Sequence, residues 1–387
     1  MHDVPRTADV VVIGGGIAGC ATAFFAQRAG LRTALVEKRP ALATLTTPVS
    51  TGAFRLQFDN PEEMALVRDS VALFADLEAR GHDLEIRRQG YLFAALTDAG
   101  AVAQAELVTR QRDWGLHDVE LLTSAQARSR FPYLGEEVKN ARFRQQDGWL
   151  NPRRLSEVLA QESGATIVLG HTVTGFLRDG GRVAGVRLGS DAIAAPWTIL
   201  CAGPFSSGLA AQAGLPLPIR PVRRHKLVLP DVPQVPQDAP MTIEYETGAH
   251  WRPALRGAFA LWTAPAGEET PLEDPPTSAA FAFGLLDPRS DHALARVAPF
   301  WNEVWGTPGL LWWLQAGYYD YTPDHRPLLG PSAVPGLALN TGYSGHGIMA
   351  GPGGSRLAID VLTGAIKAED NPFRPDRPMI ERAFDVL

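Results

Sequence analysis

The residue spacing that most strongly implies chemistry is Gly14-x-Gly16-x-x-Gly19, which joins an apolar run at 10–13 to a helical pattern. A glycine at the first position permits a tight turn from strand to helix. The second lets the phosphates of a ligand approach the backbone, and the third lets the helix pack closely against the strand. The helix N-terminus then offers free N–H groups and a positive dipole end. The spacing therefore predicts a dinucleotide site.

An acidic residue at the end of the next apolar run narrows the ligand. Glu37 follows the run at 33–36, near the position where a carboxylate binds the hydroxyls of an adenosine ribose. Such an acid suits NAD and FAD and disfavours NADP, whose ribose carries a phosphate. The motif by itself leaves NAD and FAD open.

The bulk properties predict a folded protein of two domains. The chain has 387 residues, which is too long for one simple core. Its composition, 45% hydrophobic and 20% charged, is ordinary for a folded protein. A formal net charge of −6 disfavours nucleic acid or an anionic membrane as a partner. The histidines and the two cysteines, Cys20 and Cys201, have no metal-ligand spacing, so we expect no metal site and assign both cysteines to the core.

The location of the protein is predicted from its apolar segments. Residues 1–9 lack the apolar stretch of a secretory signal, and no apolar run is long enough to span a bilayer. We therefore expect a cytoplasmic protein with no membrane span.

Three separated segments have the pattern of a single nucleotide-binding domain, namely 9–37, 165–203 and 336–366. In the last segment we expect a glycine-rich loop at 342–354, followed by a helix at 355–362. Many flavoproteins insert a substrate sheet into the nucleotide-binding domain, whereas NAD dehydrogenases usually keep that domain contiguous. The interruptions therefore favour FAD.

The intervening blocks complete the predicted fold. Residues 60–130 are mostly helical in pattern, and 215–325 alternate like strands, for example at 226–229 and 281–286. We expect an α/β fold in which a Rossmann-like FAD-binding domain of the glutathione-reductase type is interrupted by an antiparallel-sheet substrate domain. The expected limits are 1–60, 140–214 and 326–387 for the FAD-binding domain, and 61–139 and 215–325 for the substrate-binding domain.

Six short motifs carry a family resemblance over nearly the full length. They are GGGIAG at 14–19, STGAFR at 50–55, DGWLNP at 147–152, CAG at 201–203, AGYYDYTPDH at 316–325 and GYSGHG at 342–347. With these motifs the chain resembles the D-amino-acid-oxidase-type FAD-dependent oxidoreductases, which include enzymes that oxidise sarcosine, glycine and dimethylglycine. The last two motifs look most like the branch of sarcosine-oxidase β-subunits, dimethylglycine dehydrogenases and amino-acid dehydrogenases.

The chain departs from this family in two functional features, the flavin tether and the anchors for a substrate carboxylate. Some sarcosine oxidases tether the flavin through a cysteine just before the Tyr-x-Thr-Pro-Asp segment, but Tyr318 and Tyr319 occupy that region here. The resemblance therefore implies non-covalent FAD. The lysine that follows Gly-His-Gly in those enzymes is Met349 here, and the arginine of glycine oxidases is replaced at or beside Tyr319. The usual anchors for a substrate carboxylate are missing.

The motifs and the resemblance together assign the cofactor contacts. Glycines around His346 let backbone N–H groups reach the flavin ring, and the following helix adds positive potential. The expected FAD-binding residues are Gly14, Gly16, Ile17, Ala18, Gly19, Glu37, Lys38, Val173, Ala202, Gly203, Gly345, His346, Gly347, Ile348 and Met349.

Arg55, His346 and Tyr319 are the catalytic candidates. Arg55 falls where the family places a basic residue against the flavin, and a fixed positive charge there would stabilise the anionic reduced ring. The alternative is an ordinary surface arginine. His346 either faces the ring or caps its loop, and Tyr319 is either an aromatic wall of the site or sheet packing.

Tyr318, Tyr245 and Arg252 are the candidates for substrate binding. Aromatic walls with phenol donors suit an amine held over a flavin. Arg252 either binds a carboxylate through two parallel hydrogen bonds or is a charge at the edge of the sheet.

The resulting hypothesis is an FAD-dependent amine or amino-acid oxidase or dehydrogenase. The α-hydrogen of an amine or N-alkyl amino acid would pass as hydride to flavin N5, and the imine would hydrolyse. Oxygen, a quinone and a partner flavoprotein remain open as electron acceptors. The alternative is a flavin-holding subunit or assembly factor with little amine oxidase activity of its own.

Overall fold

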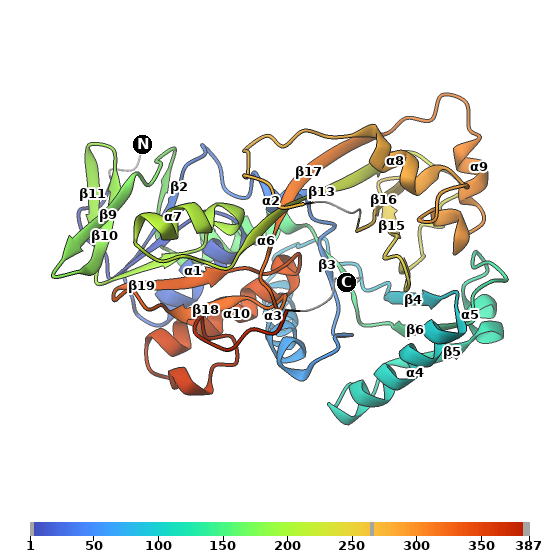
Figure 1. Cartoon of the computed structure of the whole chain (residues 1–387), viewed down its shortest axis with the longest axis horizontal. Coiled ribbons are helices and arrows are strands. Elements are labelled where there is room, and N and C mark those ends of the chain that lie inside the picture. The colour runs from blue at the N-terminus through green and yellow to red at the C-terminus, as the bar shows by residue number, and fades with distance from the viewer. Residues whose placement is uncertain (1–3, 264–266, 382–387) are drawn as a thin grey trace.

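Two β-sheets organise the protein, and they lie side by side along its longest axis (Figure 1). The computed structural model describes residues 4–263 and 267–381. The outer limits of the expected FAD-binding domain, residues 1–3 and 382–387, lie outside this range. The fold is mixed α/β, as the sequence predicts.

The first sheet has six strands in the order β18-β19-β12-β1-β2-β8. Five are parallel and only β18 is antiparallel to its neighbour. Their apolar runs are what strands covered on both faces require. The strands are β1 (Val10–Ile13), β2 (Thr33–Glu37), β8 (Thr166–Leu169), β12 (Trp197–Leu200), β18 (Leu328–Pro331) and β19 (Leu337–Thr341).

Helices cover one face of this sheet, and a small antiparallel sheet covers the other. Val10 and Val12 belong to the core under the helices, whereas Val11 and Ile13 belong to the core on the opposite face. On the helical side lie α1 (Ile17–Arg28), α3 (Pro61–Ala79), α6 (Pro152–Ser163) and α10 (Gly347–Leu362). On the other side lie β9 (Gly175–Asp179), β10 (Arg182–Leu188), β11 (Asp191–Ala194) and α7 (Ser206–Gln212).

The second sheet has eight strands in the order β17-β13-β16-β15-β14-β4-β6-β5. Its pairs are antiparallel, as expected for the substrate domain, except that β14 and β4 are parallel. The strands are β4 (Tyr91–Ala95), β5 (Glu120–Thr123), β6 (Asn140–Arg144), β13 (Arg220–Leu229), β14 (Met241–Glu244), β15 (His250–Ala254), β16 (Gly257–Leu261) and β17 (Trp313–Tyr321). Beside it lie α4 (Asp98–Asp113), α5 (Ser124–Arg130), α8 (Ala279–Leu286) and α9 (Trp301–Trp305).

Two expectations about secondary structure are wrong. The segment 281–286, expected as a strand, lies in helix α8. A short apolar run carries no period of its own, and here Phe281, Ala282, Leu285 and Leu286 turn inward at helical spacing. The glycine-rich stretch expected as a loop to residue 354 is already helical from Gly347.

Glycines persist in α10 because neighbouring elements pack against its backbone. A Cβ at Gly353 would collide with the carbonyl oxygen of Leu66 in α3, and α10 packs closely on both α3 and α1. The composition that suggests a loop therefore serves helix packing.

The expected boundary at residue 140 separates β6 from its own sheet. Strand β6 pairs with β4 and β5 in the eight-stranded sheet, which also contains β13–β17. Helix α3, expected in the substrate domain, packs instead against α10 beside the six-stranded sheet. Among the described residues, no helix combines the length and the apolar character needed to cross a bilayer.

Candidate functional site

The turn between β1 and α1 accepts only glycine at two of its positions. Gly14 has φ +110°, and a Cβ there would lie 2.6 Å from the carbonyl oxygen of Cys201. A Cβ on Gly19 would collide with the carbonyl oxygen of Gly14. The helix therefore rests directly on the turn that precedes it, as the motif predicts.

Glu37 fastens the same turn from the end of β2. Its carboxylate accepts the N–H of Gly15 at 2.6 Å and the N–H of Arg39 at 2.8 Å. Each carboxylate oxygen has a second lone pair, so Glu37 retains acceptors for hydroxyl groups. The side chain is buried at the edge of a cavity, where a ribose would meet it.

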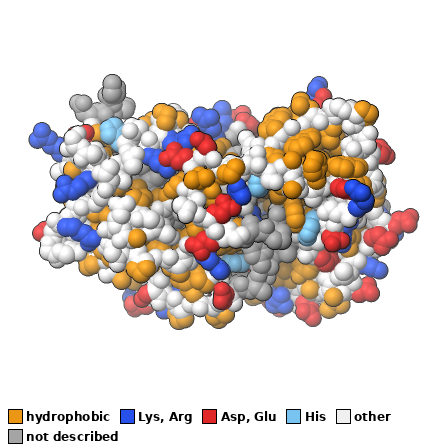
Figure 2. Space-filling view, turned by 45° about the horizontal axis from the view of Figure 1, so that its top comes forward, with side chains coloured by type: hydrophobic (Ala, Val, Ile, Leu, Met, Phe, Trp, Pro, Cys, Tyr) orange, Lys and Arg blue, Asp and Glu red, His pale blue; other side chains and the backbone are white. Residues whose placement is uncertain are grey.

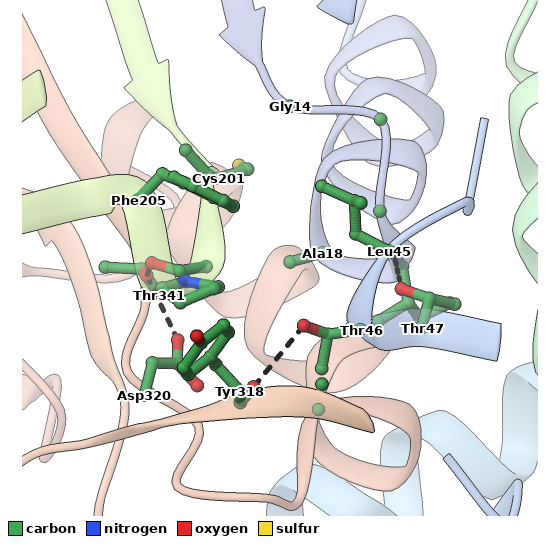
Figure 3. A pocket seen from close by; sticks show the side chains of 18 of the residues that line it. Gly14, Ala18, Leu45, Thr46, Thr47, Cys201, Phe205, Tyr318, Asp320 and Thr341 are labelled. Atoms are coloured by element: carbon green, nitrogen blue, oxygen red, sulfur yellow. Dashed lines mark hydrogen bonds between the residues drawn. The ribbon is translucent and has the colours of Figure 1, made fainter. Parts of the chain in front are cut away.

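A cavity of about 490 Å³ begins at this turn. Figure 3 shows Gly14 and strand β17 facing one another across it. Besides the turn, its lining includes the short helix α2 (Thr46–Val49), the end of β12 and the N-terminus of α10. Of the expected cofactor-binding residues, those that line it are Gly14, Gly16, Ile17, Ala18, Glu37, Lys38, Val173, Ala202, Gly203, Gly345, Gly347 and Ile348. Gly19 and Met349 pack behind this surface.

Strand β17 is tied to the other walls of the cavity. The hydroxyl of Thr46 donates to the backbone oxygen of Tyr318 at 3.4 Å, and Asp320 accepts the N–H of Gly342 at 2.8 Å and the hydroxyl of Thr341 at 3.3 Å (Figure 3). Burial raises the pKa of Asp320 to about 6, although these hydrogen bonds act to lower it. The Tyr-Tyr-Asp segment is thus held between α2 and the loop before α10.

A second cavity, of about 470 Å³, lies beyond this wall. Tyr319 and Gly345 line both cavities. A Cβ on Gly345 would approach the Tyr319 ring to 2.5 Å, so ring and backbone form one thin partition. The second cavity is lined by charged side chains, including Arg55, Glu63 and Arg142, and by aromatic ones, including Phe58, Phe93 and Tyr245.

Arg55, His346 and Glu63 form a buried polar chain in the second cavity. Nη2 of Arg55 lies 3.3 Å from Nε2 of His346, and Nδ1 of His346 lies 3.8 Å from Oε1 of Glu63. Burial, with Arg55 adjacent, lowers the pKa of His346 to about 3. The ring is therefore neutral, and because arginine can only donate, Nε2 accepts and the ring proton sits on Nδ1. Burial raises the pKa of Glu63 to about 6.

Comparison with known proteins assigns the chain to a family. The sequence model described as FAD dependent oxidoreductase matches residues 9–361. The chain belongs to this family. As an FAD-dependent oxidoreductase it binds FAD, so the choice that the glycine motif leaves between NAD and FAD is settled in favour of FAD.

Relatives of this FAD-dependent oxidoreductase match it over nearly its whole length. FAD-dependent oxidoreductase domain-containing protein 1 of Xenopus laevis is 27% identical over 98% of the chain and 85% of its own length. The mitochondrial sarcosine dehydrogenase of Mus musculus is 28% identical over 99% of the chain, which spans only 41% of that longer protein. The crystal structure of L-proline dehydrogenase from P. horikoshii shares the fold, with a TM-score of 0.83, 23% identity and coverage of 96% of this chain and 98% of that one.

The first cavity fits FAD on its own geometry. Helix α1 begins at Ile17, after Gly16, which has no side chain to cap it, so bare backbone faces the cavity. The N–H of Ile17 donates to the hydroxyl of Thr47 at 3.2 Å. Glu37 lies on the same rim, and the glycine-lined start of α10 closes the opposite part of the cavity. These features suit the pyrophosphate, the ribose and the ring system respectively.

Sequence reasoning missed Arg142 of β6. Its side chain is only 2% exposed and lines the second cavity, yet its Nε and Nη1 atoms have no hydrogen-bond partner among the described residues. In the sequence it alternates with Ala141 and Phe143, as a solvent-facing residue of a half-buried strand would. No local signal distinguishes it, because helix α4 is what covers this face.

The expected substrate-binding residues lie in three different places in the structure. Tyr245 lines the second cavity, whereas Tyr318 lines the cofactor cavity. Arg252 is in neither lining, because its Nε and Nη1 donate to the backbone oxygens of Thr51 and Pro253 at 2.8 Å each. Arg55 is not a surface residue, since it is 2% exposed.

Proposed function

We propose that this FAD-dependent oxidoreductase oxidises the C–N bond of an amine or amino acid to an imine, which then hydrolyses. The observation that supports this is the shared partition, because a buried, charged cavity adjoins the cofactor cavity across Tyr319 and Gly345. FAD, when bound, supplies the hydride acceptor. The names of the sarcosine and L-proline dehydrogenases support an amino acid with a secondary nitrogen as the substrate.

The residues of the second cavity would orient the substrate and exclude water. Phe58 packs edge-on against the His346 ring at 5.1 Å, and the Arg55 guanidinium lies 4.3 Å from the Phe58 ring centre. Arg55 also donates to the backbone oxygen of Gln57 at 2.9 Å, so its charge is fixed in place. A preorganised cation beside the partition would stabilise negative charge that develops there. Neutral His346 would help to hold the Arg55 cation beside the partition, because its Nε2 accepts from the guanidinium at 3.3 Å.

We propose a non-covalent cofactor. Cys201 lines the cofactor cavity, but burial raises the pKa of its thiol to about 12. A thiol rather than a thiolate is a poor nucleophile. Burial likewise raises the pKa of Cys20, which packs under the glycine turn.

We also propose the two-domain division, with revised limits. A Rossmann-like FAD-binding domain of the glutathione-reductase type would contain the six-stranded sheet, its small antiparallel layer and α3. The substrate domain would contain the eight-stranded sheet including β6. Both cavities would then lie where the two domains meet.

An anaerobic screen tests the proposed reaction. The purified yellow protein is mixed, without oxygen, with secondary and tertiary amino acids, D-amino acids, L-amino acids and simple amines. We expect at least one class to bleach the visible absorbance of the flavin, and dithionite serves as the positive control. If dithionite bleaches the flavin and every amine fails, the proposed reaction is rejected.

One surface feature favours the second candidate, a flavin-holding subunit. Apolar side chains gather on the part of the molecule that carries α8 and α9 (Figure 2). Phe283, Trp305, Leu311 and Trp313 are 39% to 66% exposed, and large aromatic residues left in water often mark a contact with another protein. A subunit would keep its flavin unbleached in the screen, whereas an enzyme whose acceptor is a partner flavoprotein would still be reduced by substrate. The screen therefore separates the two.

A further inference from the structure

The second cavity contains a buried cation, Arg142, whose guanidinium has unmet hydrogen-bond donors. Arg142 is 2% exposed, and both Nε and Nη1 are without a partner among residues 4–263 and 267–381. Its guanidinium lies 4.3 Å from the centre of the Phe93 ring, whose other cationic neighbour, Arg55, lies at 5.6 Å. Two guanidinium groups thus share one aromatic ring at the edge of the cavity.

The acidic groups near Arg142, namely Asp59, Asp147 and Glu246, have other contacts. Asp59 accepts a hydrogen bond from Nδ2 of Asn60 at 2.8 Å. Asp147 accepts hydrogen bonds from Arg144 at 2.5 Å, from the N–H of Leu56 at 3.1 Å and from Gln57 at 3.0 Å. Glu246 accepts the N–H groups of Leu96 and Thr97, at 3.1 and 3.0 Å. A buried charge with unmet donors is unfavourable unless something pairs with it. The geometry therefore calls for an anion from outside the chain.

Arg142 keeps its charge under physiological conditions. Burial, together with the nearby charge of Arg55, lowers the pKa of its guanidinium to about 9. At neutral pH the group is still protonated. Its planar fork of N–H donors matches the two oxygens of a carboxylate.

We propose that Arg142 binds the carboxylate of the substrate, which makes the substrate class a carboxylate-bearing amine rather than a simple amine. The proposal rests on the proposed oxidation and deepens it. It also accounts for Met349 and Tyr319 at the positions where relatives place a basic residue, since β6 supplies the charge from another wall. At about 470 Å³ the cavity is in the size range of pockets for drug-sized ligands, so a side chain or N-substituent is accommodated as well.

Calorimetric titration of the purified holoprotein with benzoate, and with its uncharged analogue benzamide, tests the anion site. We expect the wild type to bind benzoate more tightly than benzamide. Arg142→Gln should weaken benzoate about 30-fold or more, as loss of one partner of a buried charge pair does, and leave benzamide unchanged. Arg68→Gln is the matched control, because Arg68 is exposed on α3 and lines neither cavity, and it should change benzoate binding by less than about 3-fold.

A second readout does not depend on the choice of ligand. If Arg142 binds a ligand and does not stabilise the fold, Arg142→Met should raise the thermal unfolding midpoint of the ligand-free protein, because it removes an unpaired buried charge. A purely structural arginine would give a lower midpoint. The proposal is overturned if the wild type binds benzoate no more tightly than benzamide, if Arg142→Gln leaves benzoate binding unchanged, or if Arg142→Met lowers the midpoint.

The two proposals fail in different ways. If simple amines bleach the flavin while benzoate binding is insensitive to Arg142→Gln, the oxidation stands and the anchor is rejected. If Arg142 binds benzoate but no amine or amino acid bleaches the flavin, the anion site stands and the oxidation is rejected.

Discussion

The two cavities on either side of Tyr319 are lined by different kinds of groups. The cofactor cavity is lined largely by backbone and small or apolar side chains, with glycines at both of its helix N-termini. The second cavity is lined by arginines, carboxylates and aromatic rings drawn from α3, α4, β4, β6 and the loop before α10. The first cavity would hold a charged ligand through backbone N–H groups and close contact with the backbone. In the second cavity, the side chains of the protein supply the charges that would bind a ligand.

This difference determines how each cavity tolerates change. A substitution at a close-packed glycine of the cofactor cavity acts sterically, because an added methyl group has no free space. A substitution in the second cavity removes only the hydrogen bonds and the charge of one side chain, so its effect is specific to that group.

Gly19→Ala should have the largest effect. Its Cβ would collide with the carbonyl oxygen of Gly14, so α1 must move off the turn where we expect the pyrophosphate. We expect purified variant protein without bound flavin, measured as the ratio of visible to ultraviolet absorbance. Gly175→Ala is the control, because no atom lies within 4 Å of a Cβ added there. Full flavin content in Gly19→Ala would contradict this steric effect.

Glu37→Gln should weaken FAD binding on the order of 10- to 100-fold, because it would remove the charge-assisted hydrogen bonds that we expect at the ribose. The apoprotein is titrated with FAD and, in parallel, with FMN, which lacks the adenosine. FMN affinity should stay within about 3-fold of the wild type. Equal weakening of both would mean that Glu37 acts through the turn it fastens at Gly15 and not through the ribose.

Glu63→Gln tests the second cavity through stability. The pKa of Glu63 is raised from an ordinary 4.5 to about 6, so folding favours the protonated form. That contribution is complete below about pH 4.5 and is lost as the pH rises through about 6. The variant keeps the neutral form, so its free energy of unfolding in urea should match the wild type near pH 4. Above pH 6 it should exceed the wild type by about 2 kcal/mol. A constant difference at all pH values would contradict the raised pKa.

Glu273→Gln should have the smallest effect. Glu273 joins Lys38 at 2.9 Å and Arg39 at 3.0 Å outside the cofactor cavity, and it is 47% exposed. Exposed pairs of this kind contribute less than about 1 kcal/mol. We expect FAD affinity within about 3-fold of the wild type, and less difference still at high salt. A loss as large as that of Glu37→Gln would make this ion pair part of the cofactor site.

The difference between the two cavities also explains which parts of the site the sequence predicts. The β1–α1 turn and Glu37 act within one continuous segment, so their spacing alone predicts the dinucleotide site. Arg142 and Glu63 acquire their roles only when β6, α3 and the loop of His346 are brought together, and a buried arginine in an alternating strand resembles an exposed one. Helix α8 differs from the expected strand for a related reason, because its apolar run takes its period from the surface it packs against.

A crystal structure of the purified yellow protein tests the central claim most directly. We predict that the bound FAD has its pyrophosphate at the Gly14–Gly19 turn, its ribose at Glu37 and its ring system against Gly345 and Tyr319, facing the cavity that contains Arg142. An FAD whose ring lies away from that partition would contradict the account, because the charged cavity would then have no cofactor to serve.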